Sequence, residues 1–164
     1  MTQDASMEER LDRLARKAGD HVETWGSCAQ GTLLALQEEF DLGDIQSLKA
    51  ATAMPGMALR GETCGAVVGS IMVFGLEFGR EKPEDVQAMM RTMGVARRFC
   101  KEFEEKFGSC MCSGVQEHLF GRSFDLTDPQ DIQEFVAAGA AKKCRIPAEA
   151  AARIAGRMIL ESRQ

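Results

Sequence analysis

The chain has 164 residues and a net charge of -5 at pH 7, with acidic and basic side chains interspersed along its length. This length predicts a single domain whose core is large enough to fold without disulfides. No basic stripe of the kind that binds a nucleic-acid backbone is present, so we expect no nucleic-acid partner.

The sequence shows neither an export signal nor a membrane span. The N-terminal residues 1–6 are polar, and the longest uncharged run, 63–76, falls short of the about 20 apolar residues that cross a bilayer. We therefore expect a cytoplasmic protein without membrane insertion. In a reducing compartment, cysteines serve metal ligation, redox chemistry or core packing rather than a static disulfide framework. The chain has six: Cys28, Cys64, Cys100, Cys110, Cys112 and Cys144.

The first segment reads as an amphipathic surface helix. Residues 6–9 form a capping box, apolar residues follow at helical spacing, and Gly19 is a stop signal. We therefore separate an N-terminal amphipathic helix, 1–21, from a helical domain over 22–164 that contains all six cysteines.

A second helix is expected to begin at Ser27, whose hydroxyl suits a cap, and this places Cys28 in the first turn. A short helix is expected over residues 45–53, and the turn signal Met54-Pro55-Gly56 ends it.

Glycines recur every four residues at Gly61, Gly65 and Gly69, around Cys64. On a helix over 63–78 they form a ridge without side chains, which lets a neighbouring backbone approach closely. Cys64 would lie in the first turn, where free amides and the helix dipole favour a thiolate. A buried helix whose glycines serve packing alone explains the same spacing.

A long helix is expected to begin at Pro83 and to bury a stripe from Val86 through Met89, Met93, Ala96 and Cys100 to Phe103 and Phe107. Cys100 is one step of this stripe, so core packing explains it.

Further helices are expected towards the C-terminus. One runs from about Cys110 to Phe120 and another begins at Asp128-Pro129, with Cys144 just outside its end. A last helix starts at Pro147. No segment alternates apolar and polar residues with β-branched enrichment, so we predict an all-α single-domain bundle of about six to seven helices.

Without Cys100 and one of the pair Cys110/Cys112, four cysteines remain, and all fall at predicted helix ends. Thiolates converging from separate elements bind zinc or an iron–sulfur cluster, and two dithiol/disulfide couples fit equally well. The spacing contains no C-x-x-C pair and leaves these alternatives open.

These residues resemble a family of small proteins, described as redox-active, that is named for a C_GCAxxG_C_C cysteine pattern. The resemblance covers about residues 22–144. Ser27-Cys28-Ala29-Gln30 is similar to the first cysteine segment, and Cys64-Gly65-Ala66-Val67-Val68-Gly69 carries an intact CGAxxG motif. Cys112 matches the third family cysteine, Cys110 is an addition, and Cys144 matches the fourth.

The resemblance implies a four-cysteine helical redox domain with Cys28, Cys64, Cys112 and Cys144 as its site. We favour an iron–sulfur cluster held by these four for electron transfer, with glycine backbone such as that of Gly65 donating hydrogen bonds to the sulfurs. The alternatives are a metal-free thiol/disulfide oxidoreductase or sulfur carrier using Cys28 and Cys64, and a non-catalytic helical adaptor with structural zinc.

The expected partner is a redox protein or a small thiol or sulfur species. The glycine ridge and the long helix also offer more apolar surface than one small bundle covers, which predicts a homodimer. No catalytic residue outside the cysteine set is identifiable, so the sequence leaves enzyme status open.

Overall fold

The chain folds into long helices whose ends gather the cysteines on one side. The computed structural model describes residues 3–164. The expected all-α fold is confirmed, because the β structure among these residues is limited to one isolated bridge between Thr63 and Met111. The helices are α1 (Gln3–Trp25), α2 (Cys28–Phe40), α3 (Ile45–Ala50), η1 (Ala51–Ala53), α4 (Gly56–Leu59), α5 (Gly65–Phe78), α6 (Val86–Phe107), α7 (Cys112–Phe120), α8 (Pro129–Ala137) and α9 (Ala140–Ser162).

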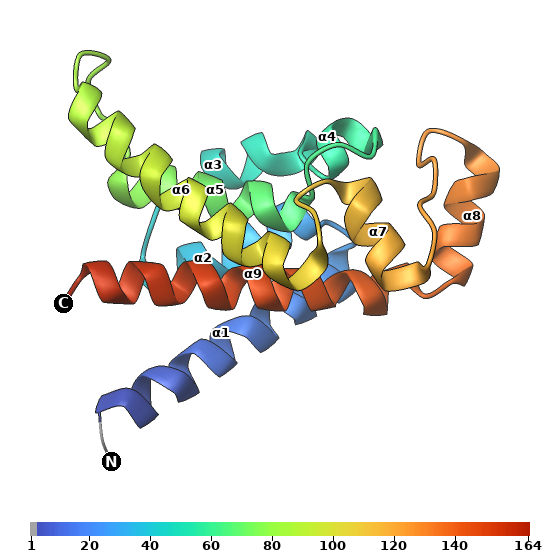
Figure 1. Cartoon of the computed structure of the whole chain (residues 1–164), viewed down its shortest axis with the longest axis horizontal. Helices are drawn as coiled ribbons and strands as arrows, with labels where there is room; N and C mark the ends of the chain where they lie inside the picture. Colours follow the sequence, from blue (N-terminus) through green and yellow to red (C-terminus); the bar gives the residue numbers. More distant parts are fainter. Residues whose placement is uncertain (1–2) are drawn as a thin grey trace.

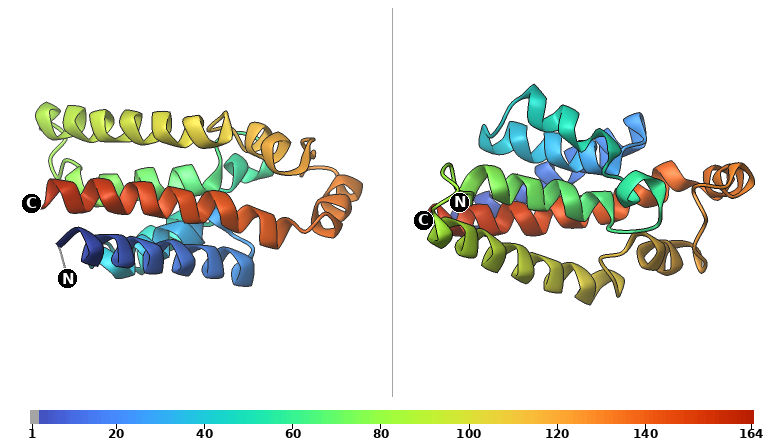
Figure 2. Two further views of the ribbon diagram at one scale, coloured as in Figure 1. Left: turned by 60° about the horizontal axis from the view of Figure 1, so that its bottom comes forward. Right: turned by 90° about the horizontal axis from the view of Figure 1, so that it is seen from above.

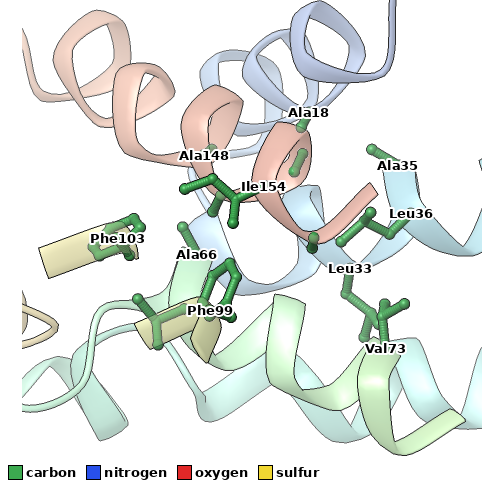
Figure 3. Packing of buried hydrophobic residues seen from close by; sticks show 14 of the residues in the cluster. Ala18, Leu33, Ala35, Leu36, Ala66, Val73, Phe99, Phe103, Ala148 and Ile154 are labelled. Atoms are coloured by element: carbon green, nitrogen blue, oxygen red, sulfur yellow. The ribbon is translucent and has the colours of Figure 1, made fainter. Parts of the chain in front are cut away.

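Five of these helices, α1, α2, α5, α6 and α9, enclose the core. In Figure 1 the start of α1 and the end of α9 lie at one end of the molecule, and α7, α8 and the start of α9 lie at the other. Figure 2 shows α1 and α9 side by side and antiparallel. The buried side chains interlock between helices, with Leu33 of α2 beside Val73 of α5 and Phe99 of α6 beside Ala66 of α5 (Figure 3).

The prediction that the first helix stops at Gly19 is wrong, although the helix has the buried apolar stripe and exposed polar face expected of it. Helix α1 continues to Trp25, and Leu11, Leu14 and Ala18 are at most 1% exposed. Gly19 is accommodated inside the helix because α9 passes so close that a β-carbon there would collide with the Glu149 side chain. The helix therefore contributes to the core along most of its length.

The start of the long helix α6 and the face that it buries also differ from the prediction. It begins at Val86 after the cap Asp85, not at Pro83, and it buries Ala88, Val95 and Phe99 instead of Val86 and Met93. The aromatic side chains decide the phase, because Phe99 packs edge-on against Phe74 of α5, with ring centroids 5.5 Å apart.

The last helix begins earlier than its proline suggests. Gly139 turns the chain with φ 85°, and α9 starts at Ala140 with Pro147 inside it. Cys144 therefore lies within the first turns of α9, whereas the prediction placed it in a loop directly after the preceding helix. Lys142 and Lys143 belong to α9 as well.

Helix α4 is left-handed. Gly56, Met57, Ala58 and Leu59 all have φ between 49° and 64°, a conformation that costs most residues about 1–2 kcal/mol each. Hydrogen bonds from Leu59 N to Pro55 O, 2.9 Å, and from Arg60 N to Gly56 O, 3.0 Å, close the turn. Without α4, the described residues form eight right-handed α-helices, close to the six to seven expected.

In the part of the chain that the structure describes, no helix combines the length and the apolar character that crossing a bilayer requires.

Candidate functional site

Four cysteines stand at or near the first residues of four helices. Cys28 is the first residue of α2, Cys64 precedes α5 as its cap, Cys112 is the first residue of α7, and Cys144 lies near the start of α9. These helix starts share the end of the molecule that carries α7 and α8 (Figures 1 and 2). The cap predicted at Ser27 is confirmed, since its hydroxyl accepts a hydrogen bond from Gln30 N at 3.4 Å.

A pair of short backbone segments fixes Cys64 beside Cys112. Cys64 N donates to Cys110 O at 2.8 Å, and Cys112 N donates to Glu62 O at 2.5 Å. Ser113 N also donates to Gly61 O at 3.0 Å. We call residues 61–64 and 110–113 the paired segments. Because they hold each other through backbone hydrogen bonds, the two cysteines cannot separate without breaking them.

The thiols of Cys28 and Cys64 are neighbours, close enough that each shifts the pKa of the other. Gly65 makes this approach feasible, because a β-carbon there would lie 2.8 Å from Ala29 N and closer still to Cys28 Sγ. At Gly69, one turn on, a β-carbon would lie 2.6 Å from Ala29 O. The glycine ridge predicted from the sequence therefore serves the packing of α5 against α2, while Gly61 lies outside the helix with φ 75°.

The pKa values of the two thiols are shifted in opposite directions. The hydrogen bond from Cys64 lowers the pKa of Cys28, helped by the amides of Gly65 and Ala29 and opposed by burial. The same hydrogen bond raises the pKa of Cys64, as do burial and the nearby Cys28 and Cys112. The expectation that the helix start favours a thiolate at Cys64 is therefore wrong: Cys64 is 4% exposed and its pKa is raised, so Cys28 is the thiol of the pair that ionises more readily.

Cys112 has a partner that the sequence analysis missed. The Gln116 side chain, 2% exposed, donates from Nε2 to Cys112 Sγ at 3.3 Å and accepts at Oε1 from Phe124 N at 2.7 Å. Burial raises the pKa of Cys112, and the Gln116 hydrogen bond counteracts part of that rise. Its spacing of four residues from Cys112 on one helix was the available signal.

A cavity of about 540 Å³ opens beside these sulfurs. Cys28, Cys112 and Cys144 line it, and Gly56 of the left-handed turn approaches Cys112, where a β-carbon would lie 3.4 Å from Sγ. Burial, and after it the electrostatic influence of the nearby Cys28 and Cys112 thiols, raises the pKa of Cys144 to about 12. The rest of the wall is largely apolar and includes Val22, Leu59, Leu126, Phe135 and Val136, with the single charged residue Lys142.

The four thiols have the right chemistry for a metal centre, but their positions do not fit one. Four thiols are the ligands that zinc and iron–sulfur clusters take. Among residues 3–164, however, no three cysteine, histidine or carboxylate side chains converge closely enough to hold a metal ion. The arrangement brings two sulfurs into contact and leaves Cys112 and Cys144 around the cavity.

The other two cysteines form a separate pair. Cys110 Sγ donates a hydrogen bond to Cys100 O at 3.7 Å, and the two thiols lie close enough that each shifts the pKa of the other. Both are half-buried. The core-packing interpretation of Cys100 thus accounts for only part of its surroundings.

An all-α domain with a contacting thiol pair, two further cysteines around a cavity and no disulfide defines a helical thiol protein. Residues 27–158 match the model of the family described as "Putative redox-active protein (C_GCAxxG_C_C)". The chain belongs to this family, which confirms the resemblance drawn from the sequence and supports a redox role. Neither the curated proteins nor the solved structures contain a match to it.

Proposed function

We propose that the chain is a thiol/disulfide oxidoreductase whose working couple is Cys28 and Cys64. The contact between these thiols, with the pKa of one lowered and that of the other raised, supports this proposal most strongly. Disulfide exchange needs a thiolate to attack and a second thiol within reach to resolve the mixed disulfide. The pair supplies both without movement of the helices.

The proposed reaction transfers two electrons. Cys28 thiolate attacks one sulfur of a substrate disulfide, which forms a mixed disulfide and releases one substrate thiolate. Cys64 then loses its proton and attacks Cys28 Sγ, so the Cys28–Cys64 disulfide forms and the second substrate thiolate leaves. The dithiol is oxidised, the substrate disulfide is reduced, and the released thiolates take up the two protons. The reverse sequence oxidises a dithiol.

The cavity indicates the kind of substrate. Cys28 lines its wall, and the wall is apolar except for Lys142. A small thiol or sulfur species with an apolar body and an anionic group would place its apolar part against Val22 and Phe135 and its charge near Lys142. Such a reaction suits a reducing compartment such as the cytoplasm, with a redox protein or a small thiol as the electron donor.

An iron–sulfur cluster is the second candidate, because Cys28, Cys112 and Cys144 share one cavity and Cys64 contacts Cys28. Such a cluster would supply one-electron transfer. Holding it would require Cys112 and Cys144 to move towards Cys28, since three ligands do not converge within residues 3–164. A structural zinc ion, with Zn–S distances of about 2.3 Å, requires a still tighter approach.

Anaerobic purification, a visible spectrum and iron, zinc and acid-labile sulfide analysis separate these candidates. We expect a colourless protein in which oxidation by a small disulfide links Cys28 to Cys64, so that peptide mapping finds both of these thiols lost. Cys64→Ser should abolish that link, and Cys144→Ser, which leaves the couple intact, serves as the matched control. Iron and sulfide in comparable amounts, lost in Cys64→Ser, would replace the couple with the cluster.

A further inference from the structure

We infer that Cys100 and Cys110 form a second reversible dithiol/disulfide couple, separate from the four-cysteine site. Cys110 Sγ donates to Cys100 O at 3.7 Å, so the Cys110 side chain lies directly beside Cys100, and each thiol shifts the pKa of the other. Neither residue belongs to the cavity wall. The inference goes beyond the proposed function and stands independently of it.

The end of helix α6 brings the two residues together. Cys100 lies in the last two turns of the helix, and Gly108, with φ 75°, reverses the chain so that Cys110 returns alongside. Gly108 N donates to Glu104 O at 2.7 Å, which caps the helix and fixes the reversal. Cys110 is fixed from its other side as well, because its carbonyl accepts from Cys64 N.

Access also favours exchange at this pair. Both residues are half-buried, as Cys28 is, so small molecules in solution reach their sulfurs.

The oxidant in this reaction is a low-molecular-weight disulfide. Cys100 attacks one of its sulfurs and releases one small thiol, leaving a mixed disulfide on Cys100. Cys110 then attacks Cys100 Sγ, and the second small thiolate leaves and takes up the proton that Cys110 gives up. Two protein thiols are oxidised and one small disulfide is reduced to two thiols.

Peptide mapping after equilibration with oxidised and reduced glutathione tests the inference. Trypsin releases Cys100 in the fragment Phe99–Lys101 and Cys110 with Cys112 in Phe107–Arg122, so fragmentation of the linked species locates the bond. In the wild-type chain we expect a Cys100–Cys110 link that glutathione alone reverses. In Cys110→Ala the link should be replaced by a glutathione adduct on Cys100.

The double variant Cys28→Ser/Cys64→Ser separates this inference from the proposed function. Retention of the Cys100–Cys110 link in that variant is the expected result, whatever becomes of the Cys28–Cys64 couple. A wild-type chain in which Cys100 and Cys110 stay free, or carry only glutathione, at an oxidised poise would overturn the inference. A Cys100–Cys112 link in place of Cys100–Cys110 would overturn it as well.

Discussion

One hydrogen bond is the main reason why Cys28 ionises more readily than Cys64. Helix starts favour a thiolate, and both residues stand at one. The pKa of Cys28 is lowered because its sulfur also accepts hydrogen bonds from the Cys64 thiol and from the amides of Gly65 and Ala29. Cys64 is more deeply buried, so charging it would cost more.

Removing the donor should therefore make Cys28 a poorer nucleophile near neutral pH. In the wild-type chain its pKa is lowered, so alkylation of Cys28 rises at a lower pH than for an ordinary thiol. In Cys64→Ala the main cause of the shift is lost, and the midpoint should move to higher pH. Iodoacetamide rates at Cys28, followed by mass spectrometry between pH 6 and about 10, measure the midpoint.

Cys64→Ser is the matched control, because its hydroxyl can still donate and the midpoint should rise less. Equal midpoints in wild type and Cys64→Ala would show that the hydrogen bond does not set the charge.

At the residue scale, the sequence was informative where chemistry is local. The Ser27 cap and the placement of Cys28 in a first turn follow from residues within one turn of each other. The lowered pKa of Cys28 does not follow from local sequence, because its main cause is Cys64, at the start of another helix. Gln116 escaped notice for the same reason, since its role requires Phe124 as well as Cys112.

At the element scale, the glycines of α5 have different surroundings on different faces. Gly65 and Gly69 face α2, where a β-carbon has no room, whereas Gly75 in the same helix has nothing within 4 Å. The four-residue spacing predicted close approach, and the structure confirms it for the two glycines inside the helix. Spacing could not identify α2 as the neighbour.

Gly65→Ala should destabilise the fold by about 1–3 kcal/mol, because the added methyl group forces Ala29 backbone and Cys28 Sγ away. Gly75→Ala, the matched control, should instead stabilise it by about 0.5–1 kcal/mol through better helix propensity. Urea unfolding followed by circular dichroism measures both. A Gly65→Ala chain as stable as Gly75→Ala would contradict the packing of α5 on α2.

The long elements α6 and α9 show why element boundaries were harder to predict. Pro83 and Pro147 each resembled a first helical residue, but Asp85 and Gly139 set the starts. The phase of α6 was misjudged by one position because methionines and phenylalanines occupy two adjacent faces. Only contact with α5 distinguishes the face that is buried.

At the scale of the whole molecule, α1 and α9 form one antiparallel pair held by both apolar and ionic contacts. Leu11 and Leu14 are buried, and Gly156 of α9 leaves room for the Leu14 side chain. Along the rim, Arg153 pairs with Glu8 and Asp12. The separation of 1–21 from 22–164 stays a prediction, although the helix itself runs to Trp25.

The apolar contacts should dominate this interface. Leu14→Ala is expected to cost about 2–5 kcal/mol because it leaves a cavity between α1 and α9. Arg153→Ala, at the same interface, should cost no more than about 1 kcal/mol, since its ion pairs are partly exposed. Thermal and urea unfolding of both variants give the comparison. A larger loss in Arg153→Ala than in Leu14→Ala would show that ionic contacts, not apolar ones, dominate this interface.

The homodimer also stays a prediction, but the glycine ridge no longer supports it. Gly65 and Gly69 are used inside the subunit against α2, so they are not available to a second copy. Val86, Met90 and Met93 of α6 remain more than half exposed. The helical fold class was predictable because the periodicity of apolar residues is averaged over the whole sequence. Assembly into a dimer depends on a few surface residues, so the sequence predicts it less well.

The left-handed turn at Gly56–Leu59 has a consequence for the order in which the protein folds. Three of its residues resist this conformation, so the turn cannot act as a local nucleus and has to be imposed by its surroundings. Gly56 lies against Cys112 at the start of α7 and against Gly61, so α7 and the paired segments must be in place before this turn can settle. The cavity wall is thus completed late in folding, and the cysteines around it stay open to oxidants in a nascent chain after the core has formed.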